Sequence, residues 1–110
     1  MTRTQDYTAN APAPADVLAL PGPTLLEFGT GWCGYCRAAQ APLAAALAPH
    51  EDLRHLKVED GPGRPLGRAY RVKLWPTLIF LRDGQEVTRL VRRDDAETIR
   101  QALAQITGAA

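Results

Sequence analysis

The two cysteines of this chain lie three positions apart, in the segment Trp32-Cys33-Gly34-Tyr35-Cys36. They follow an apolar run that is typical of a strand, and they stand at the beginning of an alanine-rich stretch that is typical of a helix. A thiol at a helix N-terminus meets aligned peptide dipoles and unpaired backbone N–H groups, which favour the thiolate over the thiol. The spacing and placement of Cys33 and Cys36 therefore predict redox chemistry.

A structural disulfide is the first alternative for this pair. In the chain-entropy model, closing a loop of four residues contributes roughly 2 kcal/mol, less than the roughly 3 kcal/mol of a 15-residue loop, before strain in the small ring is subtracted. A cross-link between Cys33 and Cys36 would thus stabilise the fold little. The spacing C-x-x-C near a strand–helix–strand pattern is more typical of a catalytic pair.

A zinc-binding module is the second alternative. His50 and His55 extend the pair to C-x2-C-x13-H-x4-H, which falls within the spacing rule for zinc fingers. If residues 36 to about 48 are helical, a rise of 1.5 Å per residue puts His50 roughly 20 Å from Cys36, whereas zinc ligands lie about 2 Å from one ion. We therefore expect no metal site. His50 is expected near a helix C-terminus, and His55 on a strand face that it shares with Lys57.

Length and charge limit the classes of function. A chain of 110 residues fits one domain with its own core. The formal net charge of +1 gives no electrostatic footprint for nucleic acid or for an anionic membrane surface. The longest apolar stretch after the polar N-terminus, residues 17–20, is too short for a signal peptide or a membrane span. We expect a cytoplasmic monomer, or a periplasmic one if a leader has been removed from the chain.

The elements that position the cysteines follow from hydrophobic periodicity and turn residues. Strands are predicted over residues 24–28, 53–58, 77–81 and 86–91, the last two joined by a tight Asp83-Gly84 turn. Helices are predicted over residues 35–48, 66–70 and 95–106, with a short helix over 15–20. Asp94 is expected to cap the last helix, with Glu97 as its capping-box partner. Residues 1–14 are expected to form a flexible arm.

This order of elements predicts an α/β fold in a single domain over residues 15–110. Parallel pairing through the crossovers and a terminal hairpin would give one mixed central β-sheet flanked by helices on both faces.

Four segments together match the pattern of one known family. They are Leu26-Glu27-Phe28, the cysteine segment, Trp75-Pro76-Thr77, and residues 80–84. With these segments the chain resembles the thioredoxin family over residues 24–106. The resemblance implies a thioredoxin-like fold and a dithiol that reduces protein disulfides. It also implies no bound cofactor beyond a redox-active Cys33–Cys36 disulfide, and an external electron donor such as a thioredoxin reductase or glutathione.

The resemblance assigns roles to the residues of these segments. Cys33 would attack a substrate disulfide, and Cys36 would resolve the mixed disulfide. Glu27 stands where the family keeps a buried carboxylate; burial would raise its pKa and suit it to exchange a proton with Cys36. A solvated glutamate on an edge strand is the alternative for Glu27.

Pro76 resembles the cis-proline that faces the dithiol in this family, although sequence alone favours a trans bond. By the same resemblance Trp75 offers its backbone to an extended substrate. Trp32 either covers the thiols or serves as an aromatic packing anchor. Gly34 and Tyr35, the two residues between the cysteines, are expected to tune the redox potential.

Several positions depart from the family pattern. Tyr35 stands where many thioredoxins have proline, and Cys-Gly-Tyr-Cys also resembles the active site of bacterial disulfide isomerases, so an oxidant or isomerase is an alternative function. Gly29 replaces the aromatic residue common after the phenylalanine of the first core strand. Arg92 occupies a place that is usually glycine near the substrate groove, and we hypothesise that it favours acidic substrates. A non-catalytic scaffold on the same fold is a further alternative, which would not require both thiols.

Overall fold

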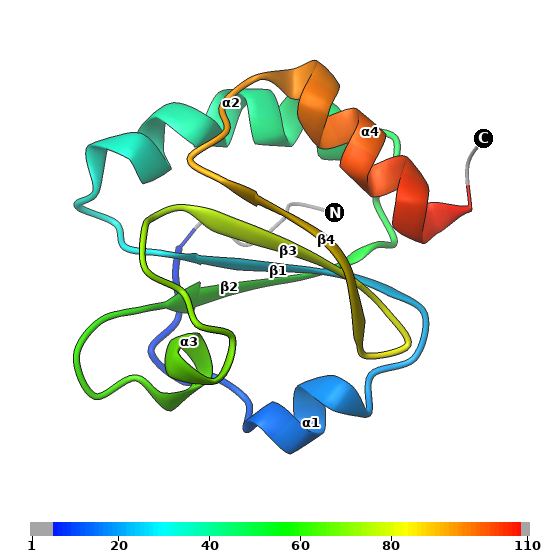
Figure 1. The fold of residues 1–110 in the computed structure, drawn as a ribbon. Coiled ribbons are helices and arrows are strands. Elements are labelled where there is room, and N and C mark those ends of the chain that lie inside the picture. The colour runs from blue at the N-terminus through cyan, green and yellow to red at the C-terminus, as the bar shows by residue number, and fades with distance from the viewer. Residues whose placement is uncertain (1–5, 109–110) are drawn as a thin grey trace.

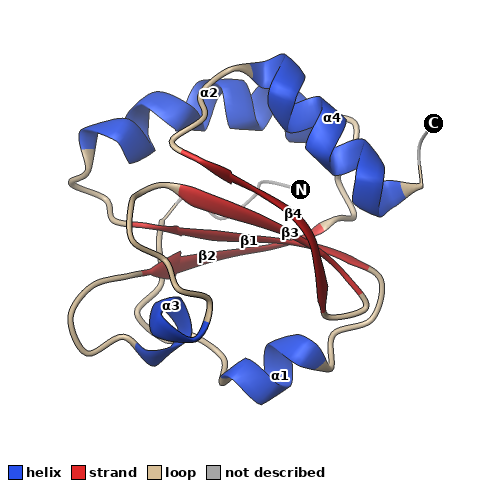
Figure 2. Cartoon of the chain, in the orientation of Figure 1, coloured by secondary structure: helices blue, strands red, loops and turns tan. Residues whose placement is uncertain are grey.

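A computed structural model describes residues 6–108, in which a four-stranded sheet lies between two layers of helices (Figures 1 and 2). The strands are β1 (Pro23–Gly29), β2 (Arg54–Glu59), β3 (Thr77–Arg82) and β4 (Gln85–Val91), and the helices are α1 (Pro14–Leu18), α2 (Gly34–Leu47), α3 (Pro65–Ala69) and α4 (Ala96–Thr107). Each element begins and ends within two residues of the range predicted from sequence. No helix within residues 6–108 is both long and apolar enough to cross a bilayer.

The sheet has the strand order β2-β1-β3-β4 and is mixed. Strand β1 pairs parallel with β2 and antiparallel with β3, and β3 pairs antiparallel with β4. The predicted parallel pairing is therefore right for the crossover through α2 and wrong for the one through α3. Strand β2 ends opposite Gly29 and β3 begins opposite Phe28, at the same end of β1. A five-residue α3 spans only about 7.5 Å, too little to return the chain along a strand of about 20 Å.

Alternation along β1 divides the core between the two helical layers. Leu25 packs in a cluster with residues of α2 and α4, whereas Leu26 and Phe28 pack in a second cluster with Val17 of α1 and Leu66 of α3. Because β1 is central and covered on both faces, its residues from Thr24 to Gly29 are all buried. Residue 27 shares the face of Leu25 and is thereby directed toward α2.

The terminal hairpin has the predicted tight turn. Asp83 and Gly84 both have positive φ, 52° and 79°, which is the pattern of a type I′ turn. The Asp83 carboxylate also accepts a hydrogen bond of 2.7 Å from the Gly22 N–H.

The cap of α4 differs from the prediction by one residue. Asp95, not Asp94, has the extended backbone of an N-cap, and its carboxylate accepts from the Thr98 N–H at 2.9 Å. Glu97 consequently lies inside the first turn, where it pairs with Arg100 at 3.2 Å and does not close a capping box. Two adjacent aspartates are both suited to capping, and the first extended residue before the helix takes the role.

The N-terminal segment pairs with the outer edge of β2 at Thr8. The Thr8 N–H donates to the Lys57 carbonyl and the Thr8 carbonyl accepts from the Glu59 N–H, both at 2.9 Å. These bonds satisfy backbone groups that an edge strand would otherwise leave unpaired. The expected flexible arm therefore does not describe residues 7 and 8, which are held against the sheet. Residues 1–5, also part of that expectation, and 109–110 lie outside the described residues.

Candidate active site

Cys33 and Cys36 lie at the N-terminus of α2, as predicted. Cys33 has the extended backbone of the N-cap, and its Sγ accepts a hydrogen bond of 3.3 Å from the Cys36 N–H. Both side chains are free thiols. Cys33 is 8% exposed and Cys36 1%, so the outer thiol is the one at the helix tip.

The two thiols have opposite proton affinities. Although burial alone would raise the pKa of Cys33, hydrogen bonds from the Cys36 thiol and from the N–H groups of Cys36 and Tyr35, with the charge of Arg92, lower it. Burial, followed by the hydrogen bond to Cys33, raises the pKa of Cys36 to about 11. As the pH rises, the reduced site therefore loses the proton of Cys33 first and keeps the proton of Cys36.

Glu27 is fully buried on β1 behind this pair, which excludes the solvated edge-strand alternative. Its Oε1 lies 2.8 Å from His55 Nε2, and its Oε2 accepts from the Tyr7 hydroxyl at 2.5 Å and from Gln40 Nε2 at 3.0 Å. Burial alone would raise the pKa of Glu27, but the hydrogen bond and charge of His55 and the bonds from Tyr7 and Gln40 lower it. The predicted rise in pKa is therefore wrong, because three donors stabilise the carboxylate.

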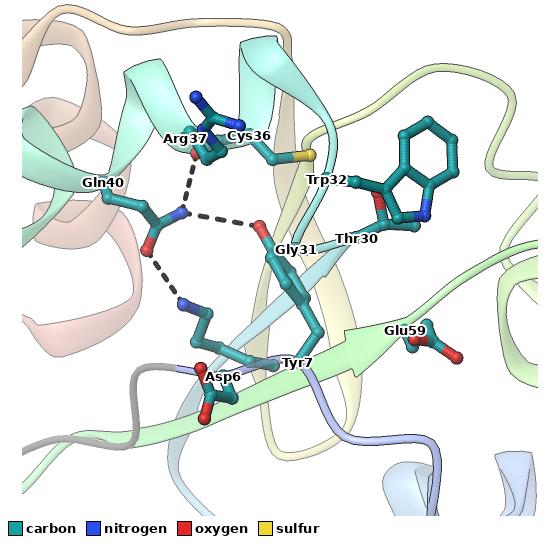
Figure 3. Close-up of a pocket in the computed structure, with 10 residues that line it drawn as sticks. Asp6, Tyr7, Thr30, Gly31, Trp32, Cys36, Arg37, Gln40 and Glu59 are labelled. Carbon is teal, nitrogen blue, oxygen red and sulfur yellow. Dashed lines mark hydrogen bonds between the residues drawn. The ribbon is translucent and has the colours of Figure 1, made fainter.

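Tyr7 stands between Glu27 and Cys36. Besides donating to Glu27, its hydroxyl lies near the Cys36 thiol, since a Cβ on Gly29 would stand 2.8 Å from the Tyr7 oxygen and 2.6 Å from Cys36 Sγ. Figure 3 shows Tyr7 reaching from the N-terminal segment toward Gln40 and Cys36 of α2. Burial, together with Glu27 and Cys36, raises the pKa of Tyr7, so the phenol stays neutral.

A cleft of about 500 Å³ opens beside these residues (Figure 3). Tyr7, Cys36, Gln40 and Lys57 are among the side chains that line it. Lys57 Nζ donates to Gln40 Oε1 at 2.9 Å and lies 4.6 Å from the centre of the Tyr7 ring. The cleft gives solvent a route to the inner thiol from the side of β2.

A different surface surrounds the outer thiol. The Trp75–Pro76 peptide bond is cis. The Trp32 ring is 73% exposed and meets the Trp75 ring edge-on, with centroids 5.7 Å apart, so it is not a buried packing anchor. The Arg92 guanidinium lies 4.1 Å from the centre of the Tyr35 ring, and Arg92 Nε donates to the Trp75 carbonyl at 3.1 Å. Gly34, the first residue of α2, has no atom within 4 Å of where a Cβ would stand.

Sequence reasoning missed Tyr7 and Gln40 and did not connect His55 or Lys57 with the dithiol. Two signals were available. Gln40 lies four residues after Cys36 and so on the same helix face, and alternation placed His55 and Lys57 on one strand face. Tyr7 had no comparable local signal, except that Gly29 left space where the family has an aromatic residue.

The cysteines and histidines that have the zinc-finger spacing in sequence do not lie together in the fold. His50 lies beyond the C-terminal end of α2, whereas Cys33 and Cys36 lie at its beginning. Among residues 6–108, no group of three or more His, Cys, Asp or Glu side chains is placed to hold a metal ion.

A pair of unequal thiols at a helix N-terminus, on a mixed sheet between two layers of helices, defines the class of dithiol–disulfide oxidoreductases. Comparisons with known proteins agree. The thioredoxin family model matches residues 10–105. The structure of reduced thioredoxin 2 from Pseudomonas aeruginosa is 51% identical with a TM-score of 0.87, covering 98% of this chain and 100% of that one.

Thioredoxin from Chlamydia trachomatis is 36% identical over 87 residues, 77% of this chain and 82% of that protein. Rice thioredoxin H2-1 is 30% identical over 73 residues, 66% of this chain and 53% of that protein. The chain belongs to the thioredoxin family. It is a thiol–disulfide oxidoreductase that reduces protein disulfides, and the comparisons support neither the isomerase nor the zinc-module alternative.

Proposed function

We propose that Cys33 is the nucleophile and Cys36 the resolving thiol of this reductase. The Cys33 thiolate attacks a substrate disulfide, forming a mixed disulfide and releasing one substrate sulfur as a thiolate. Cys36, as a thiolate, then attacks Cys33 Sγ, so the Cys33–Cys36 disulfide forms and the second substrate sulfur leaves. Two electrons pass from the dithiol to the substrate. The observation that carries these roles is the placement of Cys33 at the N-cap of α2, where it is 8% exposed and accepts from the Cys36 N–H, with the 1% exposed Cys36 behind it. The lowered pKa of Cys33 and the raised pKa of Cys36 agree with it.

Single-cysteine variants test these roles with insulin as the disulfide substrate and dithiothreitol as the electron source. Cys33→Ser should not accelerate insulin reduction. Cys36→Ser should form a stable mixed disulfide that mass spectrometry detects at Cys33. Retained turnover in Cys33→Ser would show that the assignment is reversed or wrong.

We further propose a direction of electron flow, an electron donor and a compartment for this dithiol. The dithiol acts as a reductant with a potential of about −270 mV and is re-reduced by a thioredoxin reductase or by glutathione. It works in a reducing compartment such as the cytosol, as a monomer and with no cofactor beyond its own disulfide. Equilibration with glutathione buffers tests the direction, because a potential of about −120 to −180 mV would instead indicate an oxidant or isomerase.

The substrate surface proposed here is the rim around Cys33, formed by Trp32, Tyr35, Trp75, Pro76 and Arg92. Exposed aromatic rings supply contact area for an extended chain, and Arg92 supplies a positive charge at the edge of the dithiol. The Trp75 carbonyl, which would pair with a substrate backbone, already accepts from Arg92. Substrates must therefore share or displace that bond, and an acidic side chain offers Arg92 a new partner.

A further inference from the structure

We propose that the Tyr7 hydroxyl is a catalytic group of the resolving step, turning its O–H from Glu27 to the sulfur of Cys36 as the Cys36 thiolate forms. This inference rests on the proposed roles of Cys33 and Cys36. It assigns a function to the N-terminal segment, which lies outside the four segments that carry the family resemblance.

The hydrogen bonds around Tyr7 leave its oxygen ready for this exchange. A phenol has one proton to donate and lone pairs to accept with. The proton is directed at Glu27 Oε2, 2.5 Å away, and Gln40 Nε2 donates to the oxygen at 3.4 Å. The Cys36 sulfur borders the same small space beside Gly29 as the Tyr7 oxygen. A rotation about the C–O bond is enough to direct the O–H at the sulfur.

Glu27 can lose the hydrogen bond from Tyr7 at small cost because it keeps two other donors. His55 Nε2 holds Oε1 at 2.8 Å, and Gln40 Nε2 holds Oε2 at 3.0 Å. Glu27 keeps these two donors when the O–H turns away. A newly formed Cys36 thiolate has the Thr30 backbone N–H as a donor and gains the Tyr7 O–H as a second, charge-assisted one.

The packing keeps the hydroxyl at the sulfur. A Cβ on Gly29 would lie 2.6 Å from Cys36 Sγ and 2.8 Å from the Tyr7 oxygen, so all three groups share one small space. The ring is held by the backbone pairing of Thr8 with β2 and by Lys57 Nζ at 4.6 Å from its centre.

Protons and electrons balance in the resolving step. Cys36 gives its thiol proton to a water molecule that enters from the cleft, and Tyr7 donates a hydrogen bond to the resulting thiolate and keeps its own proton. The Cys36 sulfur then attacks Cys33 Sγ; the bond between Cys33 and the substrate sulfur breaks, and the substrate leaves as a thiolate. The titratable groups around the hydroxyl are Glu27 on β1, Lys57 on β2 and Cys36 on α2, with His55 bonded to the far oxygen of Glu27. Asp6, Arg37 and Glu59 line the same cleft.

The size of the effect follows from thiol reactivity. If the hydrogen bond lowers the pKa of Cys36 by about one to two units, the thiolate fraction rises about 10- to 100-fold. The nucleophilicity of the thiolate falls at the same time by about the square root of that factor, because the Brønsted slope is near 0.5. The net acceleration is about three- to tenfold. Loss of the hydroxyl should also move the pH midpoint of resolution upward.

Stopped-flow reaction of the reduced protein with one equivalent of the aromatic disulfide DTNB separates the two steps. The first nitrothiobenzoate is released when Cys33 attacks, and the second when Cys36 resolves the mixed disulfide. Tyr7→Phe keeps the ring and removes the hydroxyl. We expect an unchanged first phase, a second phase about three- to tenfold slower, and a second-phase midpoint about one pH unit or more higher.

Tyr70→Phe is the matched control, because Tyr70 packs on Phe28 in the α1/α3 layer; both of its phases should equal those of the parent protein. Glu27→Gln should speed the second phase, since the amide oxygen of Gln is a weaker acceptor than a carboxylate and leaves the Tyr7 O–H more available to Cys36. An unchanged second phase in Tyr7→Phe, equal slowing of both phases, or a Glu27→Gln protein as slow as Tyr7→Phe would overturn the role. Absence of the first phase in the parent protein would instead overturn the proposed function.

Discussion

Tyr7 fills the space that Gly29 leaves open beside Cys36. A Cβ at position 29 would stand 2.8 Å from the Tyr7 hydroxyl oxygen, closer than real Cβ contacts allow. The glycine and the tyrosine therefore depend on each other. Where the family has an aromatic residue next to the phenylalanine of its first core strand, this chain brings an aromatic ring from its N-terminal segment and adds a hydroxyl to the inner side of the dithiol.

Gly29→Ala is expected to destabilise the reduced protein. Alanine would ordinarily favour a strand over glycine, but here the new methyl group meets Cys36 Sγ at 2.6 Å and the Tyr7 ring at 2.8 Å. Overpacking of this kind costs about 1–3 kcal/mol. Urea unfolding measures the loss, and Gly31→Ala is the control because no atom lies within 4 Å of a Cβ there. Equal stabilities of the two variants would contradict the packing argument.

Alkylation with iodoacetamide should distinguish the two thiols by pH. Because the pKa of Cys33 is lowered and that of Cys36 is raised to about 11, Cys33 should react with a midpoint below the ordinary thiol value of about 8.5. Peptide mapping near neutral pH should find the label on Cys33. In Cys36→Ser the Cys33 midpoint should shift, since its strongest stabilising hydrogen bond comes from the Cys36 thiol. Equal labelling of both cysteines in the parent protein would refute the assignment.

Acid should weaken the fold through Glu27. Its pKa is lowered in the folded state, so its carboxylate contributes stability above the unfolded-state pKa, and this contribution is lost as pH falls through the folded-state pKa. Glu27→Gln should cost about 1–3 kcal/mol at neutral pH, and the difference from the parent protein should shrink as pH falls below about 4.5. Urea unfolding across this range measures it. Glu97→Gln, at an exposed position on α4, should show no such convergence.

Local sequence patterns were enough to predict the elements and the dithiol, because both depend on residues close together in the chain. The Cys33–Cys36 spacing, the Asp83-Gly84 turn and the amphipathic last helix are local features, and the structure has each of them. The direction of β3 depends instead on how far α3 can carry the chain. A five-residue helix is too short for a return crossover, and this limit is set by distance, not by a local pattern.

The chemistry around Glu27 could not be predicted in the same way. A buried carboxylate has a raised pKa if it is alone and a lowered one if donors surround it. Two of its donors come from distant segments, since Tyr7 lies 20 residues before it and His55 lies 28 residues after it. Sequence alone shows the acid at the right position, but only the fold shows what it is bonded to.

Arg92 should set a preference for acidic substrates. Its guanidinium is exposed, covers the Tyr35 ring and bonds the Trp75 carbonyl beside the cis-proline. Arg92→Gln removes the charge and keeps a side chain that can donate to that carbonyl. Two disulfide-linked peptides that differ only in having Glu or Gln beside the disulfide serve as substrates. In Arg92→Gln we expect kcat/KM for the acidic peptide to fall about two- to fivefold, the range of an exposed ion pair, and kcat/KM for the neutral peptide to stay the same.

Arg93→Gln is the control, because it makes the same charge change one residue away, where the side chain faces Asp95 at 3.9 Å. It should leave the ratio of the two kcat/KM values unchanged. If Arg92→Gln and Arg93→Gln lower the acidic preference equally, the effect comes from net charge and not from the position of Arg92 at the rim. Raising the ionic strength should reduce the preference of the parent protein toward that of Arg92→Gln, because exposed charges are screened within about 10 Å at 0.1 M salt.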